Sequence, residues 1–85
     1  MHFRRRRWFH QVTEELQRQG FTPGGRAVSH FVRSYVRNGV YVEICGGNTL
    51  RVVKPNGAVH LYQDCSLTDA MQIISAAQLS ADFPD

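Results

Sequence analysis

Apolar side chains near the start of the chain recur with the spacing of a helix. Residues 8–19, with the sequence WFHQVTEELQRQ, place large apolar side chains about four positions apart, and the charged residues lie between them. This spacing predicts an amphipathic helix, and Gly20 is a typical residue at a helix C-terminus. The expected core-facing residues of this helix are Trp8, Phe9, Val12 and Leu16.

The end of the chain shows the same periodicity over residues 66–79. Ser66 is followed three positions later by Asp69, which is the spacing of a capping box at a helix N-terminus. The pattern therefore predicts a second helix, whose apolar stripe consists of Leu67, Ala70, Met71, Ile74 and Ala77.

The middle of the chain alternates between apolar and polar residues instead. Residues 40–45, VYVEIC, have valine or isoleucine at every second position, which predicts a strand. Gly46-Gly47-Asn48 forms a turn, and residues 50–54 and 58–63 are two further strands around Pro55-Asn56-Gly57.

The register of the last hairpin follows from its turn. Asn56-Gly57 is expected to form a two-residue type I′ turn, because both central positions of that turn need positive φ. This register places Lys54 opposite Val59. The core face would then carry Leu50, Val52, Val59 and Leu61, and the other face Arg51, Val53, His60 and Tyr62.

Residues 28–39, VSHFVRSYVRNG, fit a helix and a strand. The apolar positions have helical spacing, but three of the five are β-branched, which favours a strand. As a strand, the segment needs a three-residue loop, Arg37-Asn38-Gly39 with a bulge at Gly39, to keep arginine off the core face. Val28, Val32 and Val36 would then face the core, and Phe31, Arg33, Tyr35 and Arg37 would face outward.

These elements predict one small α+β domain over residues 1–85. The expected order is an N-terminal helix, a four-stranded antiparallel meander and a C-terminal helix, with residues 21–25 as a loop. If residues 27–37 are helical, the fold has two helices, a three-stranded meander and a third helix. A basic segment, residues 1–7, precedes the domain core, and residues 80–85 form a short acidic tail.

Charge is distributed unevenly along the chain. The formal net charge is +3, but residues 1–39 contain eight Arg and two acidic residues, whereas residues 40–85 are net acidic. Nine of the ten basic residues are Arg, which binds phosphate and carboxylate groups in a bidentate manner. An anionic partner at the N-terminal end is therefore expected.

The remaining composition bears on location and cofactors. Two cysteines without a secretory signal predict free thiols and a cytoplasmic protein. No segment approaches the roughly 20 apolar residues of a membrane span, so no membrane association is expected. No CxxC or HxxxH pair occurs, and we expect neither a metal ion nor a cofactor.

Arginine and aromatic residues are the candidates for partner binding. The arginine run beside Trp8 suits phosphate contacts, and Trp8 itself either stacks on a base or anchors the helix in the core. Arginines and tyrosines on the outer sheet face would suit single-stranded nucleic acid or an anionic protein or nucleoprotein surface. The candidate binding residues are Arg4, Arg5, Arg6, Arg7, Arg33, Tyr35, Arg37, Tyr41, Arg51 and Tyr62.

Residues 16–31 contain short motifs that resemble the HicA-type toxins of bacterial toxin–antitoxin systems. In that family a helix ends in a Gly-aromatic pair, here Gly20-Phe21, and a Gly-Ser-His on the first strand supplies a catalytic histidine, here Ser29-His30 after Val28. Residues 73–80 are similar to the end of the family's last helix. The resemblance implies a double-stranded-RNA-binding-like fold and RNA cleavage with His30 as general acid or base.

Three functions remain open from the sequence. The first is a non-enzymatic binding protein, with a build similar to small phage or mobile-element accessory factors, including anti-CRISPR proteins, that engages nucleic acid or a nucleic-acid-handling complex. The second is a HicA-like ribonuclease that uses His30. The third is an assembly subunit or homodimer that pairs through an exposed sheet edge. A binding role rather than an enzyme is favoured, because no catalytic constellation is visible.

Overall fold

The computed structural model describes residues 2–25 and 32–83, and for residues 2–6 it describes the backbone alone. One antiparallel sheet in the order β1-β2-β3-β4-β5 lies against two helices. The helices are α1 (His2–Arg18) and α2 (Leu67–Asp82). The strands are β1 (Thr22–Pro23), β2 (Arg33–Arg37), β3 (Val40–Cys45), β4 (Thr49–Val53) and β5 (Val59–Tyr62).

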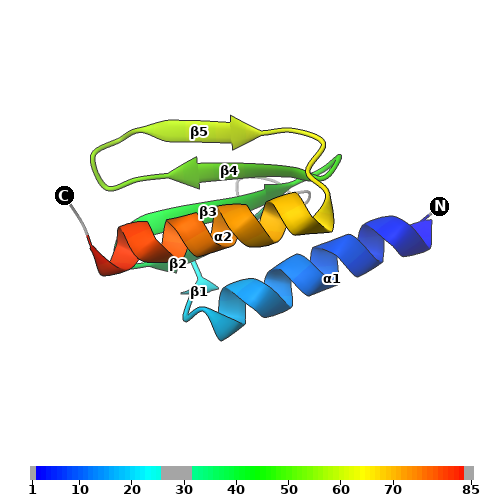
Figure 1. Ribbon diagram of the computed structural model, residues 1–85, viewed down its shortest axis with the longest axis horizontal. Helices are drawn as coiled ribbons and strands as arrows, with labels where there is room; N and C mark the ends of the chain where they lie inside the picture. The colour runs from blue at the N-terminus through cyan, green and yellow to red at the C-terminus, as the bar shows by residue number, and fades with distance from the viewer. Residues whose placement is uncertain (1, 26–31, 84–85) are drawn as a thin grey trace.

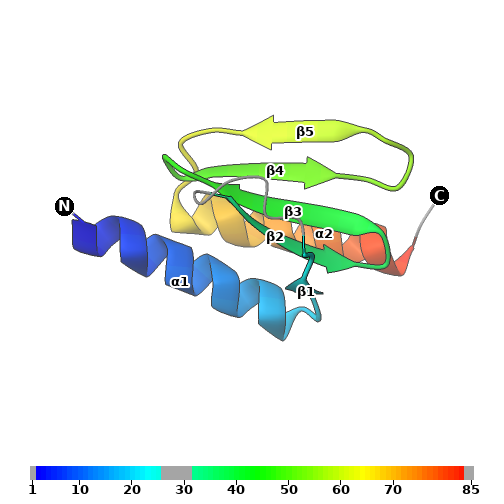
Figure 2. The same ribbon diagram turned by 180° about the vertical axis from the view of Figure 1, so that it is seen from behind.

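Both helices lie on the same side of the sheet (Figures 1 and 2). The α+β class is therefore confirmed, with one strand more than expected. Thr22 and Pro23, which were expected in a loop, pair with Val36 and Tyr35 as an additional edge strand. The alternative with a helix over residues 27–37 is wrong for its described part, because Arg33–Arg37 is a strand.

Helix α1 is longer than the apolar periodicity indicates, since it includes the arginine run. It ends at Arg18, and the predicted terminal glycine, Gly20, follows with a φ of 88°. The amide of Gly20 donates to the carbonyl of Gln17, and the amide of Phe21 donates to the carbonyl of Leu16. This pair of bonds is a Schellman motif, which requires the left-handed conformation that glycine adopts without strain.

Helix α2 begins at the predicted capping box. The Ser66 hydroxyl accepts a hydrogen bond from the Asp69 amide at 3.0 Å, and the Asp69 carboxylate accepts one from the Ser66 amide at 3.2 Å. The stripe faces the sheet as expected, and small residues in it allow close packing against the strands. Its buried residues are Ala70, Ile74, Ala77 and Ala81.

The loop between β2 and β3 is shorter than expected. Arg37 pairs with Val40, so Asn38-Gly39 alone forms the turn, and both residues have positive φ. The predicted three-residue loop with a bulge is therefore wrong. Arg33, Tyr35 and Arg37 consequently lie on the same face as Val40, Val42 and Ile44, and Val36 lies on the other.

The loop between β4 and β5 is longer than expected. Val53 pairs with Val59, and the amide of Gly57 donates to the carbonyl of Lys54, which closes a three-residue loop. Pro55 explains the difference, because its fixed φ suits the second position of a type I turn, after which Gly57 takes the left-handed bulge position.

This one-residue shift moves the β5 side chains to the other face. Leu50 and Val52 are buried as expected, but their partners are Tyr62 and His60. Val59 and Leu61, which were expected in the core, lie with Arg51 and Val53 on the opposite face of the sheet.

The core fills the space between the helices and one face of the sheet, called here the helix face. It is built mainly by α1, β3, β4 and α2, and β5 contributes no buried residue. The largest fully buried side chains are Phe21, Leu16, Ile44, Leu50, Ile74, Val12, Val40 and Val42.

Candidate nucleic-acid interface

The arginine run lies in the part of α1 that precedes its first buried residue. Trp8 is the first core residue of the helix, with 7% of its surface exposed, and positions 4–7 fall in the turns before it. These turns extend beyond the ends of α2 and of the sheet (Figures 1 and 2). The side chain of Arg7, the described member of the run, is exposed.

The charge at this end of α1 is uniformly positive. The first turn of the helix contains no acidic residue. A helix N-terminus also carries a partial positive charge from its unpaired amide groups, so four arginines there repel the helix dipole and one another. Because a bound anion would relieve both repulsions, the start of α1 favours phosphate or carboxylate groups.

The remainder of α1 anchors this end to the domain. Trp8, Val12 and Leu16 recur at every fourth position and are all buried in the core. Of the two roles expected for Trp8, the structure confirms the anchor. A buried indole is not free to stack on a base, and the candidate interface therefore depends on charge.

The expected arginine and tyrosine surface on the sheet does not assemble. Tyr35 is buried on the helix face, where it lies opposite Val42, and Tyr62 lies on the same face opposite Leu50. Tyr41 and Arg51 lie on the opposite face. The predicted outward set is therefore split between two sides of the sheet, and Phe31 lies outside the described residues.

Two of the sheet arginines are held in ion pairs. The guanidinium of Arg37 lies 2.7 Å from the Asp82 carboxylate and donates to the carbonyl of Gln19 at 3.1 Å. The guanidinium of Arg51 lies 2.6 Å from the carboxylate of Glu43, whose side chain is 5% exposed. These contacts tie the fold together, which makes both arginines poor candidates for partner binding.

Arg33 differs from the other two sheet arginines. It is exposed, and among the described residues it forms no ion pair. As the first residue of β2, it lies at the end of the sheet nearest the start of α1 (Figure 2). Of the predicted sheet residues, Arg33 is thus the one placed to extend the positive end of α1.

A catalytic site of the HicA type would depend on a histidine. His30, the catalytic candidate from the HicA resemblance, lies outside the described residues. His60 is exposed and stacks on Tyr62, with ring centroids 6.4 Å apart. Within residues 2–25 and 32–83, no three His, Cys, Asp or Glu side chains are grouped in a way that could hold a metal ion.

Both thiols are poor nucleophiles. Burial raises the pKa of the Cys45 thiol, and the nearby Glu43 carboxylate raises it further. Burial and the Asp69 carboxylate raise the pKa of Cys65 in the same way. A thiol with a raised pKa stays protonated at neutral pH, whereas the thiolate is the reactive form.

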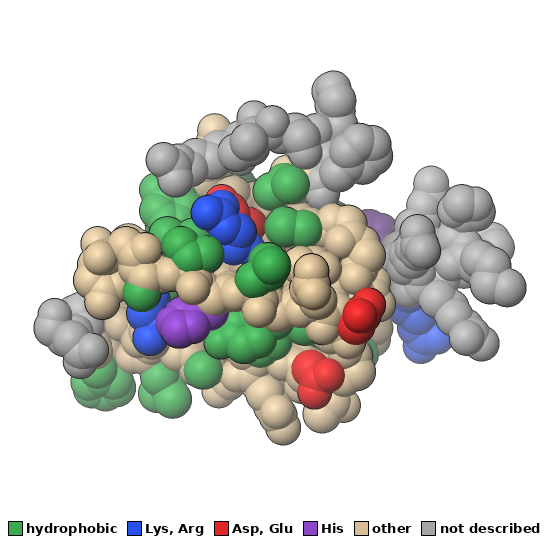
Figure 3. All heavy atoms as spheres, turned by 90° about the horizontal axis from the view of Figure 1, so that it is seen from above, with side chains coloured by type: hydrophobic (Ala, Val, Ile, Leu, Met, Phe, Trp, Pro, Cys, Tyr) green, Lys and Arg blue, Asp and Glu red, His purple; other side chains and the backbone are tan. Residues whose placement is uncertain are grey.

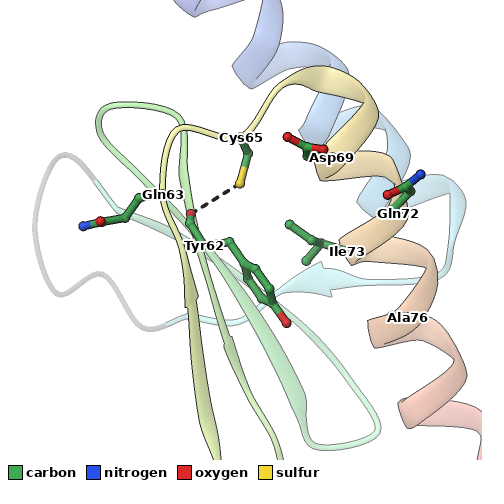
Figure 4. Close-up of a pocket in the computed structure, with 7 residues that line it drawn as sticks. All are labelled: Tyr62, Gln63, Cys65, Asp69, Gln72, Ile73 and Ala76. Atoms are coloured by element: carbon green, nitrogen blue, oxygen red, sulfur yellow. Dashed lines mark hydrogen bonds between the residues drawn. The ribbon is translucent and has the colours of Figure 1, made fainter.

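A shallow groove between the end of β5 and α2 was not predicted. Figure 4 shows the Tyr62 ring and Ile73 facing this space, while Gln63 points away from it. The Cys65 thiol donates to the Tyr62 carbonyl at 3.3 Å on its wall. Tyr62 reaches this groove because of the shifted β5 register, so a correct reading of Pro55 could have revealed it.

Within the described residues, neither helix combines the length and apolar character that crossing a membrane requires. No family model matches the chain, and neither does any curated protein or solved structure. The HicA resemblance therefore rests on the short motifs described above, and the likeness to phage accessory factors rests on the size and build of the chain.

Proposed function

We propose that the chain is a small non-enzymatic binding protein that contacts the phosphate backbone of nucleic acid through the start of α1. The observation that carries the proposal is the position of the arginine run, which lies on a helix before its first buried residue, Trp8. Arg33 contributes from the neighbouring end of β2. A protein of this kind would act as an accessory factor or inhibitor of a nucleic-acid-handling complex, as phage and mobile-element proteins do.

The proposed contact is electrostatic and not specific for sequence. Arginines that neutralise phosphates release condensed counterions, so affinity falls as salt rises. Trp8 and Tyr35, two of the aromatic residues considered for base stacking, are buried, so the proposed contact depends on charge. Four phosphate contacts predict a slope of about −3 in a plot of log affinity against log salt for a single strand.

Fluorescence anisotropy tests this proposal with labelled single-stranded RNA and single-stranded DNA of about 20 nucleotides and duplex DNA of about 20 base pairs. The double variant Arg6→Gln/Arg7→Gln is expected to weaken binding by about 10-fold to 100-fold and to reduce the salt slope by about 1 to 2.

The matched control is Arg18→Gln/Lys54→Gln, which removes the same number of positive charges away from the start of α1. Arg18 closes the other end of that helix, and Lys54 precedes the β4–β5 loop. The control is expected to bind within about threefold of the wild type. Equal losses in both double variants would show an effect of net charge alone, and an affinity indifferent to salt would contradict phosphate contact.

The same substrates separate binding from RNA cleavage. Intact RNA after prolonged incubation supports a binding protein. RNA cleavage that disappears in His30→Ala, with binding retained, would replace the proposal with the HicA-like ribonuclease.

A further inference from the structure

Strand β5 is an exposed edge of the sheet. All four of its residues are exposed, with exposed fractions of 48% for Val59 and 56% for Leu61. Its neighbour β4 pairs along one edge, and the other edge has no strand beside it in the described part of the chain. The apolar side chains of β5 therefore contact solvent on the opposite face, and its backbone is open along one edge.

The register identifies which backbone groups lie on that open edge. The amide of Lys54 donates to the carbonyl of Ala58, so residue 58 is hydrogen-bonded toward β4. Since inward and outward backbone groups alternate along an antiparallel strand, the amides and carbonyls of Val59 and Leu61 face away from β4. Both residues thus present apolar side chains together with free backbone donors and acceptors.

The features that usually prevent edge pairing are missing from β5. Exposed edges are commonly interrupted by proline, by a bulge or by a charged side chain, lysine above all. The strand sequence Val59-His60-Leu61-Tyr62 contains neither a proline nor a Lys, Arg, Asp or Glu. Such an edge is a template for another strand.

We propose that β5 pairs in an antiparallel manner with β5 of a second copy of this chain, which joins two sheets into one. A twofold axis perpendicular to the sheet places the same face of both copies on one side. Each residue must then pair with a partner residue whose side chain lies on that same face, which is an even number of positions away in the sequence. With Val59 opposite Leu61 of the partner subunit, the outward backbone groups form about four hydrogen bonds. The apolar side chains of these residues also meet across the axis.

The charges next to β5 favour a second copy as the occupant. Lys54 lies beside the start of the strand, and Asp64 lies two residues beyond its end. Figure 3, which looks onto this edge, shows hydrophobic and histidine side chains with a basic group near one end and acidic groups toward the other, and further basic groups over the middle and beyond the acidic end. Antiparallel pairing places the Lys54 end of each copy beside the Asp64 end of the other, and the charges are then complementary.

Sedimentation velocity of the full chain from about 1 to 200 µM tests the proposal. The edge is short, so we expect a weak, concentration-dependent dimer with a Kd of about 10 µM. Leu61→Lys is expected to weaken it at least about tenfold, because a charged side chain would replace the apolar contact with Val59 of the partner subunit. Val59→Lys is the second variant, and it should act in the same direction.

The matched control is Leu79→Lys. Leu79 lies on α2 with an exposed fraction of 53%, close to that of Leu61, so both variants replace a leucine of similar exposure by lysine. A dimer retained in Leu79→Lys and lost in the two β5 variants supports the proposal. A wild-type chain that stays monomeric, or a dimer weakened equally by Leu79→Lys, overturns it.

Amide exchange gives a second, direct measurement of the pairing. In the wild-type chain, exchange at the amides of Val59 and Leu61 should slow as protein concentration rises, because these groups become hydrogen-bonded in the dimer. Concentration-independent exchange at both amides would overturn the edge pairing even if a dimer forms. Neither measurement involves nucleic acid, so the outcome is independent of the function proposed for α1.

Discussion

The two edges of the sheet are built in different ways. Strand β1 has two residues, one of them Pro23, which has no amide to offer a new strand. The residue before it, Phe21, is 1% exposed, so this edge is fixed in the core directly beside α1. Both residues of β1 and all four residues of β5 are exposed, but β5 is longer and contains no proline.

The difference shows how an edge is closed or left open. The β1 edge is short, contains a proline and leads directly into the core, and each of these features prevents another strand from pairing. Strand β5 is held to the domain mainly by β4 and by the Cys65 link that follows it. The β1 edge therefore depends on packing for its stability, whereas the β5 edge is available to a partner.

Replacing Phe21 by alanine tests the packed edge and is expected to have the largest effect. Phe21 is the largest of the fully buried side chains, and its loss leaves a cavity between α1 and the sheet. Urea denaturation should show a decrease in the free energy of unfolding of about 3–5 kcal/mol.

The comparison at the other edge is Leu61→Ala, measured at a protein concentration where the chain is monomeric. Because Leu61 is mostly exposed, the free energy of unfolding should change by less than about 0.5 kcal/mol. Similar losses in the two variants would show that both edges are packed alike.

Substitution of Arg37 tests the contacts that hold the β1 side of the sheet to the helices, and it should have an intermediate effect on the free energy of unfolding. Its guanidinium joins the end of α1, through the Gln19 carbonyl, to Asp82 at the end of α2. Arg37→Gln is expected to lower the free energy of unfolding by about 1–2 kcal/mol, since the pair is only partly shielded from solvent.

The matched control is Arg18→Gln, which breaks an exposed ion pair with Glu15 within α1. Exposed pairs of this kind contribute little, so the expected change is less than about 0.5 kcal/mol. If urea denaturation gives the same result for Arg18→Gln and Arg37→Gln, Arg37 has no special role in joining the helices.

The sequence was sufficient to locate the two helices and the strands β3, β4 and β5, but it did not reveal the edge strand β1. Spacing located both helices, and turn residues gave the capping box at Ser66 and the helix end at Gly20, because these signals depend on neighbouring residues alone. The start of α1 was missed, since a run of arginines has no apolar periodicity to reveal a helix.

The two Asn-Gly turns account for most of the errors. Asn38-Gly39 forms the tight turn, although the sequence argues against this register because it puts Arg37 on the helix face. The sequence could not show that Asp82 and the Gln19 carbonyl satisfy that arginine, which is a contact between distant elements. Asn56-Gly57 is not a tight turn, and here the neighbouring Pro55 was a local signal that was available.

The error in the predicted binding surface on the sheet is a consequence of the error in the register of β2. Once β2 is shifted, Tyr35 is buried and Arg37 is paired, so the arginine and tyrosine surface is lost. The arginine run at positions 4–7 was found because it depends on composition alone. Exposure of Val59 and Leu61 could be seen only with the β5 register known.

The hydrogen bond of Cys65 tests how the end of β5 is attached to the domain, and its removal has the smallest expected effect on the free energy of unfolding. Its thiol donates to the Tyr62 carbonyl at the end of β5, and only the protonated thiol can donate. Burial, followed by the Asp69 carboxylate, raises its pKa above the ordinary value of 9.0. The thiol of the unfolded chain therefore ionises first as pH rises, so this contribution to stability is present below about pH 9 and is lost above it.

Urea denaturation at pH 7 and at pH 10 measures this contribution. The free energy of unfolding should fall more between these two pH values for the wild type than for Cys65→Ala, and the difference should be smaller than the effect of Arg37→Gln. Tyrosine and lysine titrations are common to both chains and cancel, so equal falls would show that the thiol does not hold the end of β5.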